Sequence, residues 1–170
     1  GAPKEIPEIG FTHRNEAGWS KPSTVHTDNW FCPGCPVNGP SIASHGDLVA
    51  ISRFTVSNNK AQVILRLSKT GKMKFGKEIV LDQDSPVGRC ATVFTKDAVF
   101  TVWIGHEGKQ TALQMAQVSP VGKIERRTTL APIDSNRSSG MPRAVVSGGY
   151  LWVTWTGENR VRLGRLKIGA

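Results

Sequence analysis

Apolar and polar residues alternate along most of this chain, with a period of two that predicts β-strands. Three apolar segments, at 48–54, 98–104 and 150–156, begin about 50 residues apart. Each follows a turn that contains Gly or Asp and, before that turn, another short strand. No helical period competes, because 18 Gly and 10 Pro residues interrupt the chain throughout. A repeat of this length made of short strands is typical of a β-propeller blade.

Each apolar segment is followed by a further strand with alternating residues, at 62–67, 111–118 and 160–168. The first two copies continue into an outer strand, whereas the third has none, and an unmatched strand at 17–26 precedes the first copy. We therefore expect an all-β, three-bladed half of a six-bladed propeller at 11–170, after an N-terminal lead at 1–10. Its expected parts are the outer strand 17–26, four-stranded antiparallel blades at 36–82 and 86–131, and a partial blade at 137–168 that the N-terminal strand completes.

The number of blades predicts an assembly. Known propellers close with about four to eight blades, so three blades form an open arc. Such an arc exposes apolar blade faces that carry residues such as Trp152 and Trp155, and soluble monomers rarely expose such faces. We expect a homodimer that closes a six-bladed ring, with 17–26 paired to 160–168 within one chain or across to the second copy. The alternative is a fragment that associates with the N-terminal half of a longer protein.

The charge of the chain favours anionic partners. Its 22 Lys and Arg residues against 13 Asp and Glu residues give a formal net charge of +9. Nucleic acid is one anionic class, and Arg126, Arg127, Arg160, Arg162 and Arg165 are the candidate phosphate contacts. We rank this class below a small anionic ligand, because the sequence has no recognition helix and no RNA-binding aromatic motif. The sequence also predicts no membrane span, since it has no apolar run of about 18 residues.

Several turns carry a resemblance to a known superfamily. The segments SKTGKMKF at 68–75 and THRNEAGW at 12–19 resemble worn Asp-box (BNR) hairpins of the sialidase superfamily, with Trp19 as a packing aromatic. The loops GCPVNGP at 34–40, PVGR at 86–89 and RSSGMPR at 137–143 resemble, in order, the C-terminal half of bacterial exported sialidase-like propellers of unassigned activity. This resemblance implies a six-bladed sialidase-like fold, and it implies an exported or periplasmic location.

The resemblance also implies a ligand site. An arginine cluster at the centre of sialidases holds the carboxylate of the sugar acid, and Arg89 and Arg143 match that place, at the start of innermost strands. Asn38, Trp30 and Arg53 complete the expected ligand-binding set for an anionic small molecule or glycan. The alternative for Asn38 is a tight turn with Gly39, and the alternative for Trp30 is packing beneath the proline turns. The alternative for each arginine is a bond to a nearby loop carbonyl or to a carboxylate such as Asp84 or Asp134.

Catalysis is the less favoured hypothesis. Sialidase chemistry needs a tyrosine nucleophile beside a carboxylate base, and a separate acid for the leaving group. Tyr150 is the sole tyrosine of the chain, and neither Glu107 nor Glu158 is placed in the sequence to activate it. We therefore expect a binding module with no catalytic residue and no cofactor. The alternative is a sialidase-type glycoside hydrolase that lacks its N-terminal half.

Two cysteines form a Cys-Pro-Gly-Cys motif at Cys32 and Cys35. This spacing suits a loop disulfide or two buried thiols, and Cys32 and Cys35 are the disulfide candidate. A redox role lacks the strand-to-helix setting that activates such a motif, and a zinc site needs further ligands, such as His26, His45 or residues of a second subunit. The third cysteine, Cys90, enters a predicted inner strand, and we expect it to be buried and inert.

Overall fold

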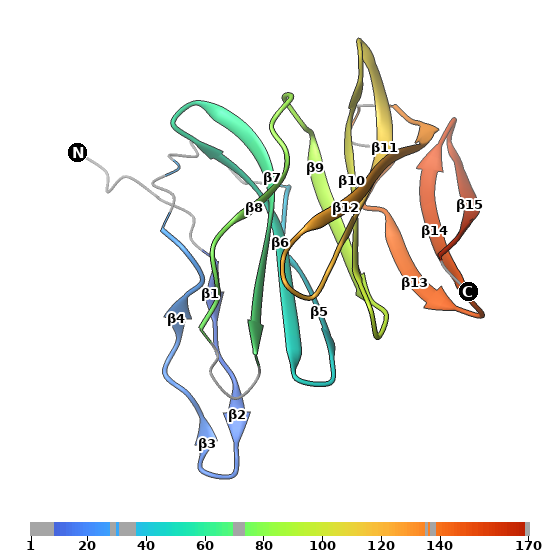
Figure 1. Cartoon of the computed structure of the whole chain (residues 1–170). Coiled ribbons are helices and arrows are strands. Elements are labelled where there is room, and N and C mark those ends of the chain that lie inside the picture. The colour runs from blue at the N-terminus through green and yellow to red at the C-terminus, as the bar shows by residue number, and fades with distance from the viewer. Residues whose placement is uncertain are drawn as a thin grey trace.

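The computed structural model describes residues 9–27, 30, 37–69, 74–134, 136 and 139–168. These residues form an all-β structure with no α-helix, which confirms the all-β part of the predicted fold class. Three antiparallel sheets stand side by side, and a separate N-terminal segment of short strands lies beside the first of them (Figure 1).

In each of the three sheets the strands pair in chain order. The first sheet consists of β5 (Ser41–His45), β6 (Leu48–Ser57), β7 (Lys60–Lys69) and β8 (Ile79–Asp82). The second consists of β9 (Gly88–Phe94), β10 (Val99–Glu107), β11 (Gln110–Val118) and β12 (Ile124–Pro132). The third has three strands, β13 (Arg143–Ser147), β14 (Tyr150–Gly157) and β15 (Arg160–Lys167). The repeated strand pattern that the sequence predicts is therefore present in all three copies.

Two-residue turns join the second and third strands of each sheet. The β6–β7 turn has Asn58 and Asn59 at φ angles of 50° and 60°, and the β14–β15 turn has Glu158 and Asn159 at 52° and 57°. These left-handed pairs match the twist of a hairpin, and Asn tolerates that conformation better than most residues. The three hairpins lie at the same end of the sheets, which is the upper end in Figure 1.

The hydrophobic core lies between the sheets, and β10 contributes to both of its parts. Val99 and Trp103 on β10 pack against the first sheet, whereas Phe100 and Val102 pack against the third. All four side chains are buried. The alternating directions of side chains along one strand thus join three sheets into a single arc.

The first strands of the sheets lie next to one another at one edge of the arc. β9 contacts both β5 and β13. The hydroxyl of Ser41 accepts a hydrogen bond from the backbone N–H of Thr92 at 2.9 Å, and the hydroxyls of Ser52 and Thr92 lie 2.6 Å apart. The three sheets do not close into a ring, so a propeller is not complete within one chain.

The prediction for the N-terminal strand is wrong within this chain. Residues 17–26 do not form one strand that pairs with β15. They contain β3 (Gly18–Trp19), which pairs with β2 (Arg14–Asn15), and β4 (Ser23–Thr24), which pairs with β1 (Gly10–Phe11).

The physical reason is a local turn. Asn15 Oδ1 accepts a hydrogen bond from the backbone N–H of Ala17 at 2.9 Å, and this turn pairs β2 with β3, so that Gly18 and Trp19 are used in a local hairpin. The segment packs on the first sheet instead, where the rings of Phe11 and Phe75 meet edge to face at 5.6 Å. Trp19 is exposed and does not pack in a blade as expected.

We predict that the thiol of Cys90 does not react in the folded protein. The pKa of this thiol is raised from an ordinary 9.0 to about 12, because burial raises it strongly, a hydrogen bond with Ser52 lowers it only in part, and the negative charge of Asp82 raises it. Alkylation at mildly alkaline pH, followed by mass spectrometry of the Cys90 peptide, should find no label until guanidinium chloride unfolds the chain. Because the folded state holds the proton more tightly, the free energy of unfolding should fall as the pH rises from about 9 toward 12. Labelling of Cys90 in the folded chain would contradict this.

Candidate functional site

The loops before the innermost strands are joined by a pair of hydrogen bonds from Asn38. Its Oδ1 accepts from the backbone N–H of Arg89 at 2.6 Å, and its Nδ2 donates to the carbonyl of Val87 at 3.1 Å. Gly88 lies between these two partners with a φ of 91°, and a Cβ at this position would approach Asn38 Oδ1 to 2.6 Å and the Phe54 Cβ to 2.7 Å. Only glycine fits here, because both the space and the backbone conformation exclude a side chain.

Arg89 connects the second sheet to the loop that leads into the third. Its side chain is almost fully covered, since the residue is 5% exposed, and its Nη1 donates to the carbonyls of Asn136 and Gly140 at 3.0 and 3.1 Å. Of the two predicted roles, these contacts match a bond to loop carbonyls. A charged donor to two carbonyls in a buried place is a strong structural contact. Ligand binding by Arg89 stays a prediction.

Arg143 has a different environment. It is the first residue of β13, opposite Thr154 on β14, and it is exposed. The two predicted arginines thus begin neighbouring innermost strands, and Arg143 is the one with its side chain in solvent. It is the more accessible candidate for an anionic ligand.

Arg53 lies away from the innermost strands, on the outward face of the first sheet. It is buried, and its Nη2 lies 3.6 Å from Glu78 Oε1. The same carboxylate oxygen lies 3.2 Å from Arg66 Nη2 and 3.3 Å from His26 Nε2 of the N-terminal segment. Because a buried guanidinium needs a charged partner, Glu78 holds Arg53 and ties the N-terminal segment to the sheet. Its expected role in ligand binding stays a prediction.

The other predicted residues give less information. The ring of Trp30 packs edge to face on Phe54 at 5.7 Å. Cys32 and Cys35 lie outside the described residues. Within the described ranges, no three His, Cys, Asp or Glu side chains come close enough together to hold a metal ion.

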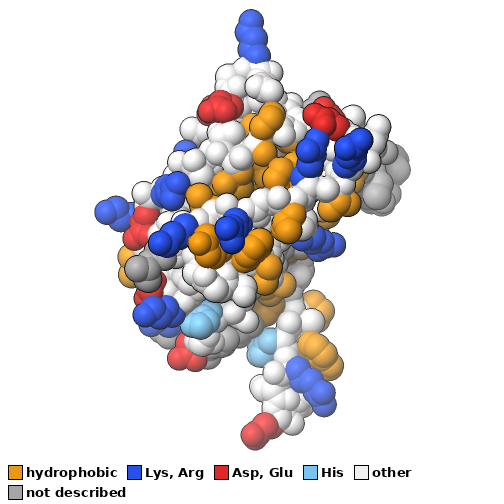
Figure 2. Space-filling model, turned by 90° about the vertical axis from the view of Figure 1, so that its right-hand side faces the viewer, with side chains coloured by type: hydrophobic (Ala, Val, Ile, Leu, Met, Phe, Trp, Pro, Cys, Tyr) orange, Lys and Arg blue, Asp and Glu red, His pale blue; other side chains and the backbone are white. Residues whose placement is uncertain are grey.

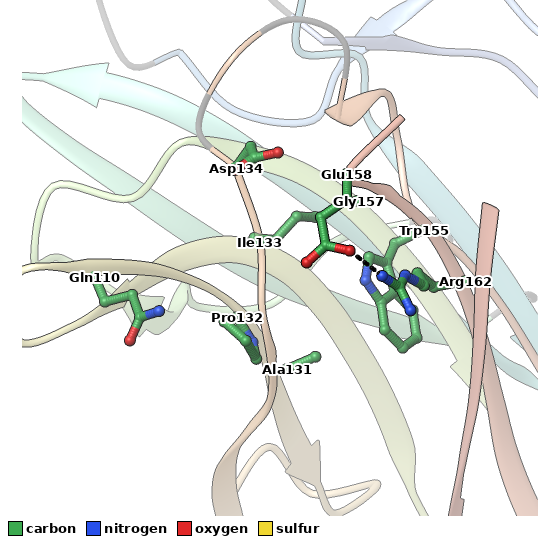
Figure 3. Close-up of a pocket in the computed structure, with 9 residues that line it drawn as sticks. All are labelled: Gln110, Ala131, Pro132, Ile133, Asp134, Trp155, Gly157, Glu158 and Arg162. Atoms are coloured by element: carbon green, nitrogen blue, oxygen red, sulfur yellow. Dashed lines mark hydrogen bonds and ion pairs between the residues drawn. The ribbon is translucent and has the colours of Figure 1, made fainter. Parts of the chain in front are cut away.

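A cleft of about 510 Å³ opens between the second and third sheets, at the hairpin end of the arc (Figure 3). Trp155 and the β14–β15 hairpin form one side, with Glu158 and Arg162 joined in an ion pair. Gln110 and the end of β12 form the other side. The described residues that line the cleft are Gln110, Ala131, Pro132, Ile133, Asp134, Trp155, Gly157, Glu158 and Arg162. Sequence reasoning did not predict this site.

No protein-family model matches this chain, and no curated protein matches it. The described residues contain no helix that could cross a lipid bilayer. The function of the chain is therefore inferred from its residues and their geometry.

We predict that Asn38→Ala lowers the free energy of unfolding by about 1–3 kcal/mol, because it leaves the Arg89 N–H and the Val87 carbonyl without their side-chain partner. Urea unfolding followed by tryptophan fluorescence measures the change. Gln83→Ala, at an exposed position in the same loop region, is the control and should stay within about 0.5 kcal/mol of the parent. Equal stabilities of the two variants would contradict a structural role for Asn38.

Proposed function

We propose that this chain is a non-catalytic binding subunit that forms half of a six-bladed, sialidase-like propeller, and that two copies close the ring. The observation that carries this proposal is the state of the third sheet. Among the described strands it has three where the other two sheets have four, and its outer face carries exposed hydrophobic side chains.

The missing strand leaves a free edge. β7 pairs with β8 and β11 pairs with β12, whereas β15 pairs only with β14 among the described strands. β15 runs over eight residues, and its outer backbone groups can pair with a further strand. Natural proteins seldom leave such an edge unprotected, because it invites pairing with another chain.

The outer face of the third sheet supports the same idea. Val145, Val161 and Leu163 are 57%, 79% and 63% exposed, and they come from the two edge strands of the sheet. Hydrophobic side chains gather over this end of the molecule in Figure 2, with Lys and Arg side chains around them. At the opposite end of the arc, Ile42 on β5 is 64% exposed. Exposed apolar residues at both ends suit contact between two arcs, head to tail and twice.

The N-terminal segment suits this assembly. It lies beside the outer strand of the first sheet, with Phe11 on Phe75 and His26 on Glu78 (Figure 1). In a closed ring, the outer strand of the preceding sheet would occupy this place. The third sheet of a second copy, with β15 next to the N-terminal segment, would supply the inner strands of that sheet. In this proposal, the expected pairing between 17–26 and 160–168 forms between two copies and not within one chain. Burial of several hundred Å² of apolar surface at each junction, at about 25 cal/mol per Å², offsets the entropy lost on association.

The ring would place Arg143 near its central mouth, on the innermost strand β13. An exposed guanidinium there can hold a carboxylate with two parallel hydrogen bonds, and the net charge of +9 attracts anions from a distance. We therefore propose an anionic small molecule or glycan as the ligand of the mouth.

We predict that the purified chain sediments and scatters light at twice its mass of 18.4 kDa. Leu163→Lys should convert it to a monomer without unfolding it, because this side chain is exposed in the single chain and would carry a charge into the junction. Val121→Lys, at an exposed position in the β11–β12 turn, is the matched control and should leave the dimer intact. A parent chain that stays monomeric at high micromolar concentration would exclude the homodimer.

We further predict that Arg143→Ala weakens the binding of N-acetylneuraminate by about tenfold or more, as expected when a hydrogen-bonded charge pair is removed. Isothermal titration calorimetry at two salt concentrations measures it. Arg126→Ala, which removes an equal charge from exposed β12, should have little effect. Equal losses in both variants would indicate general attraction by net charge and would contradict a site at Arg143.

A further inference from the structure

We propose that the cleft between the second and third sheets is a separate binding site for a neutral carbohydrate. Every residue that lines it belongs to one chain, so the site does not depend on ring closure or on the mouth at Arg143. Three features carry the inference: a tryptophan that the neighbouring sheet leaves partly uncovered, the polar groups around this ring, and the size of the cleft.

The equivalent tryptophan in the second sheet is sealed. Trp103 on β10 is 2% exposed, and its indole N–H donates to Asp82 Oδ2 of the first sheet at 2.6 Å. Trp155 holds the same place in the third sheet, since each of the two residues points to the sheet before it. Trp155 is only half-buried. The same residue type at the same position therefore has two different environments.

The strand register explains this difference. In the first sheet, Phe54, Val63 and Asp82 lie in one row across β6, β7 and β8. The corresponding row of the second sheet is Ile104, Leu113 and Ala131, across β10, β11 and β12. Ala131 thus stands where Asp82 would be needed, and its methyl group can neither accept a hydrogen bond from the indole of Trp155 nor fill the space. The cleft opens at this point, and Ala131 lines it.

The indole of Trp155 lies against its own sheet, over two glycines. A Cβ on Gly164 of β15 would lie 3.1 Å from two carbons of the six-membered ring, and a Cβ on Gly157 of β14 would lie 3.6 Å from Nε1. The ring therefore covers positions where the sheet has no side chains. An aromatic plate fixed in this way presents apolar surface together with a polar N–H, a combination that suits the mixed apolar and hydroxyl surface of a sugar.

The polar groups around the ring favour a neutral ligand. Glu158 and Arg162 form an ion pair across the β14–β15 hairpin, and Figure 3 shows this pair beside Trp155. Because the pair compensates the Arg162 charge and Asp134 adds a negative one, the cleft does not attract anions. Carboxylate oxygens accept hydrogen bonds from hydroxyls, and the amide of Gln110 can both donate and accept. Sugar hydroxyls match this set of groups.

The size of the cleft is adequate for an oligosaccharide. Its volume of about 510 Å³ lies within the range of about 300–1,000 Å³ that small-molecule sites have. A second cavity of about 180 Å³ is also lined by Trp155 and lies between β12 and the third sheet. The indole is thus accessible from more than one part of the space between the sheets.

The test uses cellotriose, maltotriose and triacetylchitotriose as probes of the full chain. Indole N–H signals in a two-dimensional NMR spectrum report on each tryptophan separately, and Trp155→Phe assigns the signal of Trp155. At least one of these neutral trisaccharides should shift this signal in a saturable manner, while the signal of the sealed Trp103 moves less. N-acetylneuraminate, the probe for the mouth, should not shift it.

Two variants examine the proposed cause. Ala131→Asp installs the equivalent of Asp82, and it should close the cleft and abolish the shift. Glu158→Gln, at the exposed hairpin tip, should weaken binding by about tenfold, as expected for the loss of one hydrogen bond to a charged group. Asp97→Asn, in the turn at the opposite end of the second sheet, is the control and should bind like the parent.

No saturable shift with any of the three trisaccharides at millimolar concentration would overturn the proposal. Binding that is unchanged in both Ala131→Asp and Glu158→Gln would also overturn it, as would a Trp155 shift with N-acetylneuraminate alone. A chain that is monomeric in light scattering but shows the expected shift would contradict the dimer and still support this site.

Discussion

The burial of both faces of the second sheet is the constraint on which the rest of the structure depends. Phe100 and Val102 point to one neighbour and Val99 and Trp103 to the other, so β10 is apolar over nearly its whole length. A half-buried strand would need polar residues at every second position. The two outer sheets can therefore attach to the second sheet on opposite sides, and each is left with one face that it does not cover.

The first and third sheets differ in what lies on the face that points away from the second sheet. On the first sheet, the N-terminal segment covers part of the face, and Glu78 compensates the buried Arg53 and reaches His26. On the third sheet, Val161 and Leu163 remain exposed. Arg53, Trp103 and Trp155 occupy equivalent places, and their surroundings differ because the element in front of each sheet differs. The chemistry of one repeated position is thus set by its neighbour and not by the repeat itself.

Most of the fold could be predicted from the sequence, because alternation and turn residues are local signals. The apolar segment predicted at 48–54 is the first part of β6 (Leu48–Ser57), and the turns before the long strands lie where expected. The N-terminal strand could not be predicted in this way. Its pairing depends on a side-chain turn at Asn15 and on which distant edge is within reach, and neither has a periodic signature.

The candidate site was predictable only in part. The sequence places Asn38 and Arg89 at the starts of innermost strands, and the structure shows that they bond to each other and to loop carbonyls. Loops with little regular structure need such bonds, since buried backbone groups must be satisfied. The cleft at Trp155 was missed, because it depends on the alignment of Ala131 with Asp82 across two sheets. Comparison of equivalent rows between repeats could have revealed it.

The pairing of strands in chain order has a consequence for how the protein folds. Each sheet is a meander whose hairpins close short loops, and short loops cost little entropy to close. Folding should therefore be able to start in any of the three sheets. The contact between Phe11 and Phe75 spans a much longer stretch of chain. Docking of the N-terminal segment is thus expected to be a late event, which follows the formation of the sheet on which it rests.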